Sequence, residues 1–500
     1  MKYLFFFVIV IFSNNLLADD LSSSSSLTLD ELLVTIFQPF VNFLASIFFF
    51  DIMGFPIIVL WLITGSIFFT IYLKFVNLRL FTHAIDVVKG KYSNPNDPGK
   101  VTHAQALFTA VAATVGLGNI AGVAIAITLG GPGAVIWMMI AAFFGMTAKY
   151  SEVLLGLKYR QISKDNHLFS GPFYYLRDGL KDIGHAKLGK ILSIIAAIFC
   201  IFGAIGAGIL FQSNQAVEII SSEFNLGSLG QFVIVIILAS IIGFVLIGGV
   251  VRIANIAEKI VPFMAIIYVI SCLTIILVNH SHVYEGVRLM FLSAFSENSA
   301  IYGGVIGAII QGVKRSAFSN EAGIGSATIA HGAAKTKEPV REGAVAILEP
   351  FIDTIIICFM TGLVITITGA YIGSDGLGGV LITAKAFATV SNSFSTLLSF
   401  IVLLFAFSTM LTYCYYGRQA WDFLSKGKYE NVCYSIFIFF VVLGGMLNLG
   451  IVIDLADILF LSMSIPNLIG LYLLAPIIKK ETKIYIKKLK AGEFKKVKNL

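Results

Sequence analysis

The chain has 500 residues, of which 57% are hydrophobic and only 13% charged, and its mean hydropathy is +0.90. A soluble protein of this composition could not cover its surface with polar groups, so the totals predict an all-α integral membrane protein. The formal net charge of +7 matters through its distribution, because basic loops mark the cytoplasmic side of a membrane. We expect a lipid bilayer around the chain and no nucleic-acid partner.

The N-terminus resembles a secretory signal. Residues 1–18 combine Lys2, an apolar run and a small residue before Asp19, which is typical of a signal peptide; an uncleaved extra helix is the alternative. Residues 19–54 are predicted to form a periplasmic tail and an interfacial segment, the latter at residues 37–50.

Residues 55–478 are predicted to form one transporter domain. Basic residues follow the first span at 55–75, so that end lies inside and the mature N-terminus outside. Later spans are expected at 104–129, 135–157, 191–219, 232–250, 260–278, 284–313, 344–367, 397–416, 436–449 and 458–478, which gives about eleven. Residues 479–500 are predicted to be a basic cytoplasmic tail on anionic lipid.

The stretch at residues 114–133, TVGLGNIAGVAIAITLGGPG, interrupts an apolar segment with six glycines and one amide, Asn119. Each Gly weakens a helix by about 1 kcal/mol relative to Ala, so this density predicts a broken helix. A break at membrane depth exposes N–H groups that can hold a carboxylate and carbonyls that can hold a small cation. Glycines that only allow close helix packing are the alternative interpretation.

A second broken helix is predicted at residues 284–313, with its break at the polar SENSA run and the two glycines after it. The alternative places the break at residues 318–326, FSNEAGIGS. That alternative puts Lys314 and Arg315 in the outer half of the membrane, which is unfavourable, so the first option is preferred. Residues 318–326 are then expected at the cytoplasmic mouth.

The spans after the first form two sets of five helices. Each set begins with a broken helix, and the two sets have opposite orientations. Inverted repeats with discontinuous helices at matching positions are typical of secondary transporters.

Several motifs resemble the alanine or glycine:cation symporter family. The longest is TAVAATVGLGNIAGVAIAITLGGPGAVIWMMIAAFFGMTAKYSEVLLGLKYR at residues 109–160. The others are GPFYYL at 171–176, QSN at 212–214, FSNEAGIGSATIAHGAA at 318–334, DT at 353–354 and FAFSTM at 405–410. The resemblance implies a leucine-transporter-type fold and sodium-coupled uptake of a small neutral amino acid through a bacterial inner membrane. Ile209 and Tyr413 depart from the Asn and Trp that family members often carry there.

The resemblance also implies a substrate site at the first break. Backbone N–H groups of Leu117 and Gly118 are expected to bind the substrate carboxylate, a charge-assisted bond. Carbonyls of Ala113 and Thr114 are expected to bind its ammonium group, although Thr114 could equally bond its own helix. Further predicted contacts are Gln212, Phe295, Gly303, Gly304, Thr409 and Tyr413; for Phe295 a lipid-facing position is the alternative, and Asn214 is expected to be structural.

A sodium site is predicted beside the first break. Sodium is a hard cation that prefers several oxygen ligands. The expected ligands are the carbonyls of Ala112 and Val115 and the side chains of Asn119, Ser408 and Thr409. A Ser or Thr in a membrane helix can instead bond a carbonyl one turn back, and Asn119 can simply brace the break.

Intramembrane carboxylates are rare and usually functional. Glu152, Glu349 and Asp353 are expected near the inner ends of their helices, as ion pairs of an inner gate that Glu321 also closes. The histidines show no metal-ligand spacing and are expected to be hydrogen-bonded or solvated.

The leading hypothesis is therefore a sodium:alanine/glycine symporter that works as a monomer. A proton-coupled transporter is the nearest alternative, but residues 111–123 contain no carboxylate. A pore or receptor would lack inverted broken helices. The sequence shows no nucleophile with a base and no Walker motif, so neither an enzyme nor direct use of ATP is expected.

Overall fold

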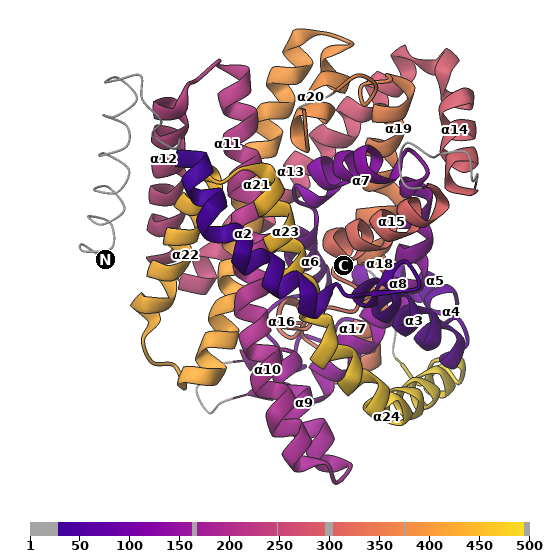
Figure 1. Cartoon of the computed structure of the whole chain (residues 1–500). Coiled ribbons are helices and arrows are strands. Elements are labelled where there is room, and N and C mark those ends of the chain that lie inside the picture. Colours follow the sequence, from indigo (N-terminus) through magenta and orange to yellow (C-terminus); the bar gives the residue numbers. More distant parts are fainter. Residues whose placement is uncertain (1–28, 163–167, 248, 296–303, 375–376, 495–500) are drawn as a thin grey trace.

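The protein is a bundle of helices, as expected from its composition (Figure 1). The computed structural model describes residues 29–162, 168–247, 249–295, 304–374 and 377–494. Within these ranges seven helices are long and apolar enough to cross a membrane, or eight if a bent pair counts as one span. This count establishes a multi-span helical protein. The predicted number of eleven spans and the inverted repeats remain predictions. The proposed signal peptide lies outside the described residues.

The N-terminal part comprises α2 (Leu29–Phe48), β1 (Asp51–Ile52), β2 (Phe55–Pro56), α3 (Ile57–Tyr72), α4 (Val76–Arg79) and α5 (Phe81–Val88). Next in the chain are α6 (His103–Thr114), η1 (Gly118–Gly122), α7 (Val123–Gly130), α8 (Ala134–Lys158), β3 (Gln161–Ile162), β4 (Leu168–Phe169), α9 (Pro172–Asp182), α10 (Ala186–Ile205), η2 (Gly206–Leu210), α11 (Phe211–Glu223), α12 (Ser228–Ile247), α13 (Gly249–Val278) and η3 (His280–His282). The C-terminal part comprises α14 (Val283–Phe295), α15 (Gly304–Asn320), α16 (Ala327–His331), α17 (Pro339–Ala346), α18 (Leu348–Pro350), η5 (Phe351–Cys358), α19 (Phe359–Ile367), α20 (Val380–Ala388), α21 (Asn392–Ser425), α22 (Glu430–Met446), α23 (Leu449–Leu461) and α24 (Ser464–Lys490).

The first break is where the glycines predicted it. Helix α6 begins at a capping box formed by Thr102 and Gln105 and ends at Thr114. The backbone at Val115 leaves the helical region (φ −74°, ψ 83°), and a π-helical turn, η1, begins at Gly118. The span is bent by 56° at this break.

The preferred position of the second break, at residues 296–304, lies almost entirely outside the described residues. The structure shows a break at the alternative position, residues 321–326. Helix α15 continues past Lys314 and Arg315 to Asn320, and the chain then breaks at residues 321–326. Three residues there have positive φ: Glu321 (57°), Gly323 (87°) and Gly325 (92°). Helix α15 therefore continues past residue 313, where the span was expected to end.

An acidic partner explains this difference. Asp457 of α23 lies 2.7 Å from Nζ of Lys314 and also pairs with the guanidinium of Arg315, which is only 1% exposed. Two basic side chains inside the membrane-spanning region are thus compensated by a carboxylate more than 140 residues away in the chain.

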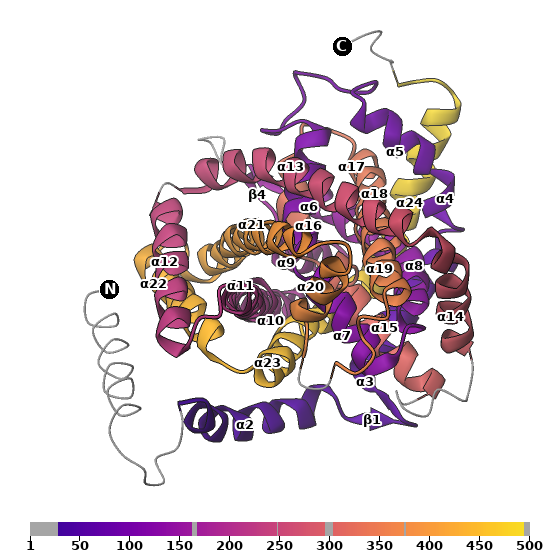
Figure 2. The same cartoon turned by 90° about the horizontal axis from the view of Figure 1, so that it is seen from above.

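The two breaks meet in the middle of the bundle. A Cβ atom on Gly118 would lie 3.4 Å from both the Phe318 ring and Cα of Ser319, so the first break packs directly on the end of α15. Viewed along the bundle, α6, α16 and α21 lie inside, whereas α2, α12 and α14 lie at the periphery (Figure 2). Helix α2, which contains most of the predicted interfacial segment, packs along α23.

One guanidinium joins the loops at the end of the bundle that carries α9, α16, α17 and α24, here called the basic end (Figure 1). Arg160 donates to the carbonyls of Gly332 and Ala334 at 2.9 and 2.7 Å. It also donates to the carbonyls of Pro98 and Thr336 at 2.7 and 2.6 Å. The segment before α6 and the segment after α16 are therefore held side by side.

Candidate functional site

Asn119 stabilises the first break through both ends of its amide. Its Oδ1 accepts the Gly116 N–H at 3.2 Å, and its Nδ2 donates to the carbonyl and to Oδ1 of Asp353 at 3.0 and 2.6 Å. Both side chains are buried. Asn119 thus braces the break and also connects it to η5.

Asp353 is the site residue that the sequence placed wrongly. It was expected in an ion pair at the inner gate, but no basic side chain within the described part of the chain forms a salt bridge with it. Its Oδ2 instead accepts hydroxyl groups of Ser319 at 2.5 Å and Thr354 at 2.8 Å. A carboxylate held only by neutral donors at a helix break is suited to attract a cation.

Gln212 of α11 reaches the first break, as predicted. Its Oε1 accepts the Leu117 N–H at 3.2 Å, and its Nε2 donates to the carbonyl of Ala207 in the π-helical turn η2 at 3.1 Å. Asn214, two residues later, points elsewhere and donates to the carbonyls of Gly444 and Leu447. Of the two amides, only Gln212 contacts the break.

Thr409 of α21 contacts the first break from another side. Its hydroxyl donates to the carbonyl oxygen of Ala112 at 3.4 Å, so two of the predicted sodium ligands lie side by side. A Cβ atom on Gly116 would lie 2.5 Å from the Thr409 hydroxyl and 3.4 Å from Oε1 of Gln212. The structure therefore brings Ala112, Gly116, Gln212 and Thr409 together.

The other predicted residues of this region are buried, but their polar groups have local partners. The Ser408 hydroxyl donates to the Phe405 carbonyl of its own helix at 3.1 Å. The Thr114 hydroxyl lies 3.3 Å from the Ala110 carbonyl, which agrees with the alternative interpretation of that residue. Ala113 and Val115 lie in the last turn and at the end of α6.

Tyr413 joins α21 to the second break. Its hydroxyl donates to Oε1 of Glu321 at 2.6 Å, and the Ser326 hydroxyl donates to the other carboxylate oxygen. Thr409 and Tyr413 are one helical turn apart, so one face of α21 contacts both breaks.

Two predicted substrate contacts, Phe295 and Gly304, are not brought to this cluster. The Phe295 side chain is 57% exposed and packs on Trp137, with ring centroids 5.6 Å apart, which corresponds to its lipid-facing alternative. A Cβ atom on Gly304 would meet nothing within 4 Å. Gly303 lies outside the described residues. The wall opposite the first break is formed by Phe318 and Ser319 instead.

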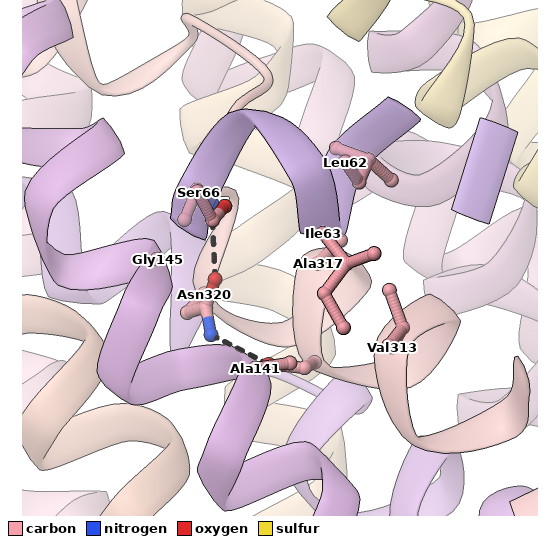
Figure 3. Close-up of a pocket in the computed structure, with 10 residues that line it drawn as sticks. Leu62, Ile63, Ser66, Ala141, Gly145, Val313, Ala317 and Asn320 are labelled. Carbon is pink, nitrogen blue, oxygen red and sulfur yellow. Dashed lines mark hydrogen bonds between the residues drawn. The ribbon is translucent and has the colours of Figure 1, made fainter. Parts of the chain in front are cut away.

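A small pocket, lined mainly by apolar residues, lies beside the second break, between α3, α8 and α15 (Figure 3). Its volume is about 20 Å³, which is enough for about one water molecule. Asn320 points into it, accepts the Ala322 N–H, and donates to Thr354, the neighbour of Asp353, at 3.0 Å. The pocket is too small for an amino acid but is connected to Asp353 by hydrogen bonds.

Replacing Gly116 with Ala is expected to lower transport at least tenfold. The new methyl group would lie 2.5 Å from the Thr409 hydroxyl, so either the break or α21 must shift. Uptake of labelled substrate into proteoliposomes measures the effect. Gly227→Ala is the matched control, because its Cβ atom meets nothing within 4 Å. Normal uptake by Gly116→Ala would contradict the packing described here.

The sequence profile of the sodium:alanine symporter family matches residues 37–499. The sodium/alanine symporter AgcS of Methanococcus maripaludis is 40% identical over 434 residues, covering 86% of this chain and 94% of AgcS. The probable sodium/glutamine symporter GlnT of Bacillus subtilis is 32% identical over 445 residues, covering 89% of this chain and 90% of GlnT.

Among solved structures, this one is similar to that of MhsT in complex with L-phenylalanine. The TM-score is 0.55 at 14% sequence identity, and the match covers 77% of this chain and 99% of MhsT. At this identity the likeness concerns the fold alone. It agrees with the leucine-transporter-type fold that the sequence motifs imply.

Proposed function

Because the chain belongs to the sodium:alanine symporter family, we propose that it uses a sodium gradient to import alanine or glycine by alternating access. Amino-acid symport itself is the activity of the family. The observation that carries the finer proposal is the convergence of Asn119, Gln212 and Thr409 on the first break. In this proposal the substrate carboxylate binds the N–H groups of Leu117 and Gly118, and Gln212 vacates the Leu117 N–H for it.

The proposed cation site has two sides. The Ala112 carbonyl, in contact with the Thr409 hydroxyl, would form one side, and the Asn119 amide oxygen and the Asp353 carboxylate would form the other. All of these groups supply oxygen, which is what a hard cation prefers. A cation and a substrate that bind more tightly to the closed conformation of the protein would shift the population toward that conformation.

We also propose the orientation that the basic residues imply: a bacterial inner-membrane protein with its N-terminus periplasmic, its C-terminus and basic end cytoplasmic, acting as a monomer. The two relatives described above carry names that specify alanine and glutamine. The small residues around the break, Ala112, Ala113 and Gly116, favour a small substrate for this chain.

Proton coupling is the second candidate. The sequence argued against it because no carboxylate lies near Asn119 in the chain, but folding places Asp353 2.6 Å from the Asn119 amide. Uptake driven by a pH gradient, with choline replacing sodium, would favour the proton. Uptake that needs sodium and survives collapse of the pH gradient favours the sodium proposal.

Replacing Asn119 with Ala is expected to lower sodium-dependent alanine uptake about tenfold or more. The change removes the three hydrogen bonds that brace the break, each contributing about 1 kcal/mol. Labelled alanine uptake into proteoliposomes, in sodium and in choline, measures it. Asn431→Ala, at an exposed position, is the control. Equal wild-type uptake in the two salts would refute sodium coupling.

A further inference from the structure

Five buried titratable side chains form a row at the basic end, here called the His331 row. In order they are His103 of α6, Glu342 of α17, His331 of α16, Glu349 of α18 and Lys149 of α8. The row connects the basic-end halves of both broken spans to α8 and to the helices that follow the second break. The transport site described above uses none of these side chains.

Carboxylates lie on both sides of the His331 ring. Nδ1 lies 2.7 Å from Oε1 of Glu342, whose other oxygen pairs with Nδ1 of His103. On the opposite side, Nε2 lies 3.5 Å from Oε2 of Glu349, which is ion-pair distance without hydrogen-bond geometry. Oε1 of Glu349 lies 2.8 Å from Nζ of Lys149.

This geometry needs a proton. A neutral imidazole carries one N–H, so its second nitrogen would present a lone pair to a carboxylate, without water between them. A doubly protonated His331 instead presents positive charge to both carboxylates. His103 differs, because only its Nδ1 lies beside a carboxylate, that of Glu342, whereas both nitrogens of His331 face one.

Charge balance leads to the same result. With both imidazoles neutral, Lys149 opposes the two carboxylates Glu342 and Glu349 and the row carries −1, so one protonated imidazole makes it neutral. His331 is the ring that lies between the two carboxylates. A buried net charge is strongly unfavourable, so the proton stabilises the row. The surrounding charged groups are Glu152 and Glu321, which lie within electrostatic range of Lys149, and Arg160, which lies within range of Glu342.

We propose that His331 is a proton-binding site that fastens α16, and through Glu342 also α6, to α17 and α18. When the proton leaves to the cytoplasm, Nε2 and Glu349 repel each other and the basic end loosens. This deepens the proposed function, because loosening here is a step of alternating access. The transported substrate and its cation bind elsewhere, so the proton acts on the conformation.

Cysteine accessibility tests the proposal without measuring transport. Ala330, beside His331, is buried, so Ala330→Cys reacts with a polar maleimide only when the basic end opens. The full chain is placed in lipid nanodiscs, and the rate at Ala330→Cys is divided by the rate at Lys428→Cys, an exposed position, to remove the intrinsic pH effect. The five native cysteines are buried, and the chain without either change gives their background.

We expect the ratio to rise between pH 6 and pH 9, with a slope of up to about tenfold per pH unit, the limit for release of one proton. His331→Asn should remove the slope, and His103→Asn should keep it, since both contact Glu342 but only His331 faces two carboxylates. A flat ratio in the wild-type background, or a slope that persists in His331→Asn, would overturn the proposal. Uptake independent of sodium would refute the proposed function and leave this result intact.

Discussion

Replacing Asp353 with Asn is expected to raise the sodium concentration needed for half-maximal uptake at least tenfold. Asn keeps the shape of the side chain and can still bond Ser319 and Thr354, but it removes the negative charge beside Asn119. A tenfold change corresponds to about 1.4 kcal/mol, which is modest for the loss of a buried charge next to a cation. Initial rates of labelled alanine uptake, measured across a sodium titration, provide the value.

The control for this variant is Glu285→Gln, because Glu285 is a solvent-exposed carboxylate on the peripheral helix α14. It should transport like the wild type. If Asp353→Asn keeps the wild-type sodium dependence but loses dependence on external pH, the carboxylate carries a proton and the second candidate function holds. An unchanged response to both ions would remove Asp353 from the site.

Replacing Asp457 with Asn is expected to destabilise the folded protein by about 3–5 kcal/mol, the usual effect of removing one partner of a buried ion pair. Lys314 and Arg315 both pair with this carboxylate, and two N–H-bearing atoms of Arg315 have no other hydrogen-bond partner among the described residues. The change therefore leaves two poorly solvated positive charges. Thermal unfolding of the purified protein in detergent measures it.

Asp51→Asn is the control, because Asp51 is exposed, whereas Asp454 on the same helix lies within electrostatic range of Lys314 and Arg315. It should unfold at the wild-type temperature. Replacing all three charged residues with apolar ones of similar size, Lys314→Met, Arg315→Met and Asp457→Leu, should recover most of the stability. If Asp457→Asn unfolded at the same temperature as the wild type, the ion pair would contribute nothing to the stability of the fold.

The first break could be predicted because its cause is local. Glycines concentrated within one apolar segment weaken the helix wherever the rest of the chain lies. The second break could not be predicted the same way. Lys314 and Arg315 look unfavourable inside a span without their partner Asp457, and nothing near them in the sequence indicates that a distant helix supplies it.

The site was predictable where a motif carried it. Gln212, Asn119 and Thr409 meet at the break as the family resemblance implied. Asp353 was visible in the sequence, but its contact with Asn119 spans 234 residues and depends on the π-helical turn η5. Phe295 was misplaced because lipid-facing and buried positions are equally apolar in a membrane helix, so hydrophobicity cannot separate them.

The four carbonyls held by Arg160 constrain how this protein can move. They belong to the segment that precedes α6 and the segment that follows α16. Val101 and Ala334 in these two segments also form a β-bridge. Helices α6 and α16 are therefore coupled to each other through these two segments. A rigid-body motion that displaces α6 must therefore also displace α16. Both breaks would then become accessible from the basic end at the same time.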